Sequence, residues 1–256
     1  MRNYVKADFY RVITSRSFLG AVAGVFAMNM LGCMQCSFTV DVISIQYFSN
    51  MYSLFILVFA FGSMAYANSM VEDSEHKFWY LAIQKGNIQG YAKSKILTAF
   101  FSAIVATVLG TMLFVFVERV RMPFFDSGNI VIEEIAAHSV WGDLIRKGWG
   151  IAYFLGVSFL QGILAGILAL VSMLLSLCVK SRMFTICIPV IGFYFFTNYL
   201  GNMTGYLNLS SLYIAGMPVF ENNLLSICYD LLLASVIYWG MEAAIIMKLE
   251  KEIKGK

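Results

Sequence analysis

The chain has 256 residues, of which 60% are hydrophobic and only 13% carry a charge. A soluble domain carries about 25% charged residues, so this composition excludes an ordinary soluble globular protein. With a mean hydropathy of +0.75, it predicts a multi-pass membrane protein. The net charge of +3 indicates little by itself, because the basic residues are sorted by position along the chain.

The chain opens with a basic, aromatic segment, residues 1–17, that is suited to lying in the membrane surface. Asp8 interrupts its charged part and several apolar stretches follow, so we expect it not to be a cleaved signal peptide. Those stretches predict an all-α, polytopic fold in a single domain, because about 20 apolar residues in a helix cross a bilayer. The six predicted transmembrane helices cover residues 18–35, 47–68, 96–117, 149–178, 183–200 and 224–247.

Two polar segments are predicted to lie together on one side of the membrane. Residues 118–150 form a large loop between the third and fourth spans, and 132–147 within it predict an amphipathic helix. Residues 201–222, rich in asparagine and serine, predict a short ordered excursion before the sixth span. Pro189 predicts a kink in the fifth span.

The distribution of positive charge predicts the orientation. Six spans place both termini on the same side of the membrane, and fourteen of the 18 basic residues fall on that side. The positive-inside rule therefore predicts cytoplasmic termini in the cell (plasma) membrane, with residues 70–95 also in the cytoplasm. The basic residues predicted on the outer side are Arg119, Arg121, Arg146 and Lys147.

Residues 70–95 are the longest strongly charged segment between two apolar ones. Acids come first, a compact aromatic-aliphatic run follows at 78–83, and Lys85 and Gly86 close it. This predicts a short helix, capped by Asp73 or Ser74 and ended by the glycine. The run is too short to span a bilayer and too apolar for an idle loop. It packs either into another protein or, alternatively, onto its own bundle or the lipid interface.

Four glycines and two acids stand out within the predicted spans. Small residues four apart allow close helix approach, either within one bundle or in a dimer. Intramembrane acids are costly and are candidates for a proton or cation role, unless they lie at headgroup level. The glycines are Gly20, Gly24, Gly162 and Gly166, and the acids are Asp230 and Glu242.

The sequence carries no recognisable catalytic, metal-binding or nucleic-acid-binding motif. His76 and His138 are predicted on opposite sides of the membrane, and Cys33 and Cys36 form a CxxC without a second pair. HExxH, GxSxG and GxxxxGK[ST] motifs are absent. We therefore expect no catalytic residue, cofactor or metal site in this chain and no nucleic-acid partner. If the protein uses ATP, another subunit must hydrolyse it.

The layout and residues 70–95 together resemble the membrane (permease) subunit of ABC-2 type transporters, a family of six-span permeases. The resemblance covers nearly the whole chain in layout. It is most specific in an acidic stretch, a short helix, a glycine, and a tyrosine and lysine at the start of the third span. The Gly-Thr that often precedes that helix and the Pro that often follows it are absent. The matching residues are Glu72-Asp-Ser-Glu, Trp79-Tyr-Leu-Ala-Ile, Gly86, Tyr91 and Ser94-Lys95.

In that family the loop is a coupling helix that docks in a groove of a separate ATP-binding subunit, where ATP and Mg²⁺ are bound. The resemblance implies that this chain forms a translocation path with a second, identical or related permease, and that residues 1–17 brace the ATPase. Small permeases of this kind resemble exporters of antimicrobial peptides, which implies an amphipathic peptide or other hydrophobic substrate. The residues implied to contact the ATPase are Glu72, Asp73, Glu75, Phe78, Trp79, Leu81, Ile83, Lys85 and Gly86.

Two other classes of function fit the same sequence. An ion-coupled secondary transporter would use Asp230 or Glu242 and would depend on an ion gradient rather than on ATP. A non-transporting membrane scaffold would use residues 70–95 only for docking. An enzyme is the class with the least support.

Overall fold

The computed structural model describes residues 2–36, 40–52, 55–75, 88–126, 129–179, 181–200 and 207–254. These residues contain helices and no strand, which confirms the predicted all-α class for this part of the chain. The helices are α1 (Arg2–Ile13), α2 (Arg16–Gln35), α3 (Val42–Asn50), α4 (Ile56–Met64), α5 (Ser69–Glu75), α7 (Ile88–Arg121), α8 (Ile130–His138), α9 (Gly142–Arg146), α10 (Gly150–Ser176), α11 (Arg182–Phe195), the π-helical η2 (Phe196–Leu200), α12 (Leu209–Tyr213) and α13 (Asn223–Lys254).

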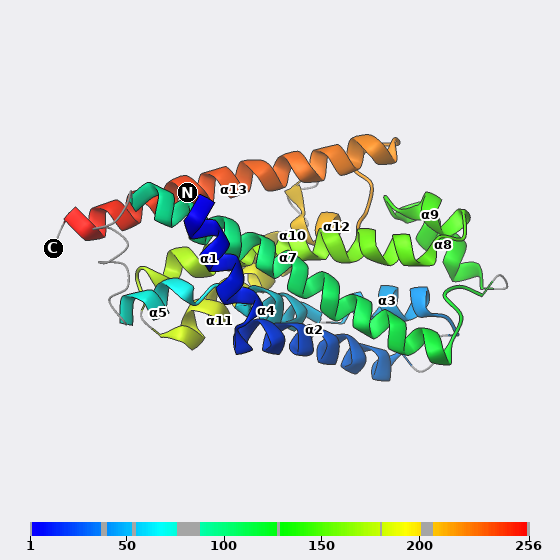
Figure 1. Cartoon of the computed structure of the whole chain (residues 1–256). Helices are drawn as coiled ribbons and strands as arrows, with labels where there is room; N and C mark the ends of the chain where they lie inside the picture. Colours follow the sequence, from blue (N-terminus) through cyan, green and yellow to red (C-terminus); the bar gives the residue numbers. More distant parts are fainter. Residues whose placement is uncertain are drawn as a thin grey trace.

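The long helices run side by side, so the molecule has two distinct ends (Figure 1). Both chain termini and α5 lie at one of them, which we call the terminal end. Helices α8 and α9 lie at the other, which we call the loop end. Helices α1 and α5 therefore lie at the same end of the bundle as the C-terminal part of α13 (Figure 1).

Four of the described helices are long and apolar enough to cross a membrane: α2, α7, α10 and α13 as far as Lys251. This indicates a membrane protein. These helices include or overlap four of the predicted spans, 18–35, 96–117, 149–178 and 224–247.

The second and fifth predicted spans fall on shorter helices. Residues 47–68 are divided between the end of α3, the whole of α4 and a turn at 65–68. Helix α3 ends because the N–H groups of Met51 and Tyr52 bond to the carbonyls of Phe48 and Ser49, three residues back, which closes the last turn. Residues 183–200 comprise most of α11, with Pro189 inside it, followed by η2.

The single amphipathic helix expected over 132–147 is instead two short helices, α8 and α9. The N–H of Val140 donates to the carbonyl of Gly216 at 2.8 Å, so the chain leaves the helical path there. Gly142 then lies directly against the carbonyl of Ala136, where any side chain would overlap that oxygen. The tertiary bond and the close contact together break the predicted helix.

Helix α10 is the centre of the bundle. Of its membrane-spanning stretch 78% is buried, against 17% for α13. It packs against α4, α7, α11 and α13 through a core that includes Phe59, Ala103, Leu164 and Tyr213. Helix α13 is thus the least buried of the four long helices.

Three of the four singled-out glycines let helices approach closely within the chain. A Cβ on Gly162 would lie 3.0 Å from the backbone of Ile104, and one on Gly166 would lie 2.7 Å from the ring of Phe100, so both lie where α10 meets α7. A Cβ on Gly24 would overlap the ring of Phe61. Gly20 meets nothing within 4 Å in the described chain.

Replacing Gly162 by leucine should therefore destabilise the protein by about 1–3 kcal/mol or more, because the backbone of α7 must move to admit the side chain. The matched control is Gly20→Leu, which has open space around it and should change stability little. Thermal unfolding of both variants in the same detergent measures the difference. Equal stability of the two variants would contradict this packing.

Candidate functional site

A largely buried group of charged and hydroxyl side chains lies at the terminal end of the bundle. It links α1, the turn after α4, α5 and the first turns of α7 through hydrogen bonds and ion pairs. We call it the anchor network. Its members are Asp8, Arg11, Tyr66, Glu72, Asp73, Tyr91, Ser94 and Lys95.

Lys95 is the central cation of the anchor network. Its side chain is only 2% exposed, and its Nζ lies 3.1 Å from Oδ1 of Asp8 and 2.9 Å from Oδ2 of Asp73. It also donates to the hydroxyl of Tyr66 at 2.8 Å. Two hydroxyl groups also donate to the Asp8 carboxylate: that of Ser94 to Oδ2 at 2.6 Å, and that of Tyr66 to Oδ1 at 2.7 Å.

Arg11 is the second cation, and it connects α1 to α5. Its guanidinium lies 2.7 Å from Oδ1 of Asp73 and 3.0 Å from Oε2 of Glu72. Tyr91 donates its hydroxyl to the other oxygen of Asp73. Asp73 thus joins α5 to both α1 and α7, and its side chain is only 4% exposed.

Helix α11 joins the same region by weaker contacts. Arg182 lies 3.8 Å from the second carboxylate oxygen of Glu72. Thr185 donates to the side-chain oxygen of Asn68 at 3.1 Å, in the turn that precedes α5. Helices α1, α7 and α11 therefore all hold α5 in place.

The charges of this region balance when every group is ionised. Three carboxylates (Asp8, Glu72 and Asp73) face three cations (Arg11, Lys95 and Arg182). Buried charges are tolerated when they are paired and hydrogen-bonded. This balance explains how so many charges are accommodated at one end of an apolar bundle.

The electrostatics of Asp73 and Arg11 follow from this pairing. Burial alone would raise the pKa of Asp73, but the charge of Lys95 and the hydrogen bonds from Arg11 and Tyr91 outweigh it and lower that pKa below its ordinary value. Burial alone would lower the pKa of Arg11, but its bond to Asp73 raises it. Both groups are charged at neutral pH.

Acid should therefore weaken the anchor network. A carboxylate whose pKa is lower in the folded state than in the unfolded state stabilises the fold above its ordinary value of 3.8. That contribution is lost as the pH falls through the folded value. We expect Asp73→Asn to be less stable than the native protein at neutral pH, and the difference to shrink below about pH 4. Unfolding curves at several pH values measure this, and a constant difference would be inconsistent with an ionised Asp73.

The network includes two of the residues predicted to contact an ATPase. Glu72 and Asp73 both lie on α5, where Asp73 is buried in intramolecular bonds and the side chain of Glu72 is 32% exposed. Glu75 is the last residue of α5. The remaining predicted contacts, Phe78, Trp79, Leu81, Ile83, Lys85 and Gly86, lie outside the described residues.

Sequence reasoning did not identify the intramolecular partners of those acids. In the sequence, Asp8 is an acid within a basic segment and Arg11 is one of the several cations of that segment. Tyr91, Ser94 and Lys95 appeared only in the family pattern. A usable signal exists, because residues spaced three and four apart lie on one face of a helix. By that rule Asp8 and Arg11 share a face of α1, and Tyr91, Ser94 and Lys95 share a face of α7.

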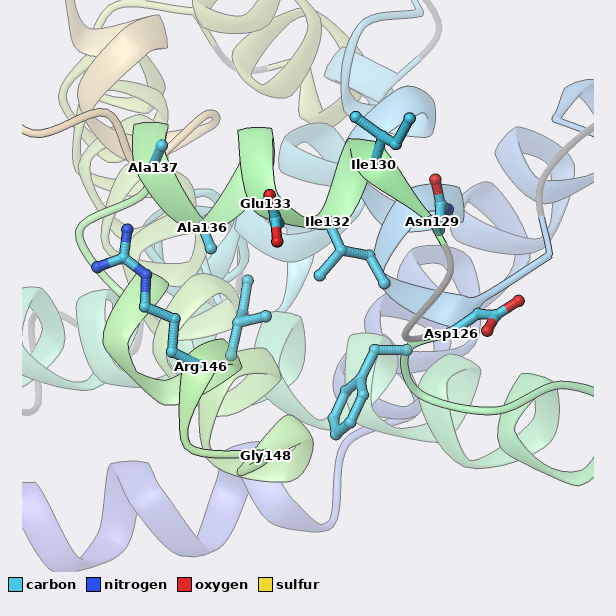
Figure 2. A pocket seen from close by; sticks show the side chains of 11 residues that line it. Asp126, Asn129, Ile130, Ile132, Glu133, Ala136, Ala137, Arg146 and Gly148 are labelled. Atoms are coloured by element: carbon cyan, nitrogen blue, oxygen red, sulfur yellow. The ribbon is translucent and has the colours of Figure 1, made fainter.

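A cavity of about 830 Å³ lies at the loop end, between α8, α9 and the chain that precedes α8. In Figure 2, Ile132 and Ala136 project from α8 toward the side on which Arg146 of α9 stands. Arg146 pairs with Asp143 at 3.6 Å, and Asn129 bonds to Asp41 at 2.6 Å. Two of the polar side chains that line the cavity, Arg146 and Asn129, thus already bond to other residues of the chain. Among the described residues, no cluster of three or more His, Cys, Asp or Glu side chains could hold a metal ion.

The two intramembrane acids have different surroundings. Glu242 lies beside a groove between α7 and α13 and pairs with Lys93 at 3.3 Å. Asp230 is fully buried, and neither of its carboxyl oxygens has a hydrogen-bond partner in the described chain. Of these two acids, only Glu242 therefore has an ion-pair partner among the described residues.

Comparison of the chain with known protein families, with curated proteins and with solved structures finds no match. The fold by itself defines the class: an all-helical membrane protein with at least four long apolar helices. Its described part contains a largely buried ion-pair network at one end.

Proposed function

We propose that this chain is the permease subunit of an ATP-driven exporter, and that residues 76–87 dock onto a separate ATP-binding subunit. In this proposal α3 with α4, and α11 with η2, supply the second and fifth of six membrane crossings. The terminal end faces the cytoplasm of the cell. A second permease, identical or related, completes the translocation path, and the substrate is an amphipathic peptide or another hydrophobic compound.

The observation that carries this proposal is the position of the anchor network around residues 76–87. Asp73 lies just before this segment, on α5, and Tyr91 and Lys95 lie just after it, on α7. Bonds between them fasten both ends of the segment to each other, and Arg11 fastens them to α1. A protein that pushes on residues 76–87 would therefore act directly on α1 and α7.

The energetics suit such a role. Breaking a buried ion pair by removing one partner costs about 3–5 kcal/mol, so the network resists distortion better than an exposed loop. Helix α7 in turn contacts α10 along its length through Gly162 and Gly166. Movement of α7 would thus reach the centre of the bundle.

Co-purification tests the proposal. The chain carries no phosphate-binding loop, so we expect it to form a stable complex with an ATP-binding protein, the first candidate being one encoded by a neighbouring gene. We also expect the complex to hydrolyse ATP faster in the presence of this chain. Failure to associate, combined with transport that survives ATP depletion and collapses with an ion gradient, would instead favour an ion-coupled transporter.

A further inference from the structure

Asp230 is the one acid of the described chain that is fully buried with neither carboxyl oxygen in a hydrogen bond. It lies about two turns from the start of α13, within that helix's membrane-spanning stretch. Its backbone carbonyl accepts a hydrogen bond from the buried hydroxyl of Tyr213 on α12, at 2.6 Å. The residue thus lies where α12 is fastened to α13.

Among the described residues, the helices packed around Asp230 supply no counter-charge. Helix α10 carries no charged residue, and the only titratable group of α12 is Tyr213. The charged residues of α7 all lie at its two ends: Lys93 and Lys95 at one, Glu118, Arg119 and Arg121 at the other.

On α13 itself, Tyr229 is adjacent to Asp230, and Glu242 lies more than three turns away, bound to Lys93. Glu221, before α13, is exposed.

Two polar side chains that link the end of α12 to the rest of the bundle are uncharged as well. Asn50 donates its amide to the carbonyl of Ile214 at 3.5 Å, and Gln161 of α10 donates to Asn50 at 3.4 Å. An isolated carboxylate in such a place is very unfavourable, and a buried acid usually takes up a proton instead. The geometry therefore favours the neutral acid.

We propose that Asp230 is a proton-binding site that links protonation to the packing of α13 against α10 and α12. With the proton bound, α13 lies as described here. When α13 moves away and water reaches the carboxyl group, the O–H bond breaks, the proton passes to a water molecule to form hydronium, and the electron pair stays on the carboxylate. Helix α13 suits this movement because it is the least buried of the four long helices.

Infrared spectroscopy of the purified, full-length protein tests the protonation state directly. The native protein at neutral pH should show the C=O stretch of a protonated carboxyl group in an apolar setting. That band should shift when aspartate is isotopically labelled, should disappear in Asp230→Asn, and should persist in the control Glu242→Gln. Absence of a label-sensitive band at neutral pH would overturn the proposal. This outcome can be seen in the native protein alone, without a variant.

Thermal unfolding tests the link to packing. Because the folded state favours the neutral acid, the native protein should lose stability as the pH rises above the ordinary titration range of aspartate. Asp230→Asn, which is uncharged at every pH and nearly equal in shape, should lack this loss, and Asp230→Glu should retain it. The same pH dependence in the native protein and in Asp230→Asn would overturn the proposal. Neither experiment uses ATP or transport, so both are independent of the proposed exporter function.

Discussion

Replacing Lys95 by methionine should lower the free energy of unfolding by about 3–5 kcal/mol. Methionine fills a similar volume but removes the cation that lies 3.1 Å from Asp8 and 2.9 Å from Asp73. Asp8 then keeps only hydroxyl donors, and Asp73 keeps only Arg11 as a cation. The cost arises mainly from leaving a buried carboxylate without its counter-charge.

Lys93→Met is the matched control for this substitution. Lys93 lies two residues away on the same helix, but its side chain is 44% exposed and its one ion pair among the described residues is with Glu242. Exposed ion pairs contribute about 0–1 kcal/mol, so its loss should hardly change the unfolding curve. Denaturant or thermal unfolding of both variants in one detergent measures the contrast. Equal stability of the two variants would refute the anchor network as described.

Replacing Phe78 and Trp79 together by aspartate should abolish stimulation of the partner ATPase and ATP-driven transport. If residues 76–87 form the proposed docking surface, two charges there would prevent its burial against the partner, and buried aromatic residues often carry most of the energy of an interface. The protein itself should still insert and fold, because the anchor network lies in the flanking segments. Membrane content and the unfolding temperature should therefore stay near native values.

Trp149→Asp provides the comparison for that variant. Trp149 is an exposed aromatic residue that precedes α10 near α9, at the loop end. If residues 76–87 form the docking surface, this change should leave ATPase stimulation intact. Equal loss of stimulation in both variants, or unchanged transport in the Phe78/Trp79 variant, would contradict the docking assignment.

The all-helical fold and four long spans followed from the sequence because apolar stretches without charge need only be counted. The limits of the shorter helices were harder to predict, since some of them depend on tertiary contacts. Helix α3 ends in a local tight turn, and the break between α8 and α9 depends on a bond from Val140 to Gly216, which is distant in sequence. No local pattern encodes such a bond.

The candidate site could likewise be predicted from the sequence only in part. The acids Glu72 and Asp73 stand out in the sequence because they precede an apolar run. Their partner Arg11 lies more than sixty residues earlier in the chain, and Lys95, which pairs with Asp73, lies about twenty residues later. Hydropathy treats Lys95 as the edge of a span and cannot show that it is buried. Likewise, Gly162 and Gly166 suggested close packing, but only the structure identifies α7 as the partner.

Site-specific photo-crosslinking tests the central claim most directly. A photoreactive amino acid placed at Ala82, within residues 76–87, should crosslink to the ATP-binding subunit in intact membranes. The same group at Val120, exposed near the end of α7 that lies farthest from the anchor network, should not. This pattern would support both the docking segment and a cytoplasmic terminal end. Crosslinks from Val120 but not from Ala82 would contradict the account.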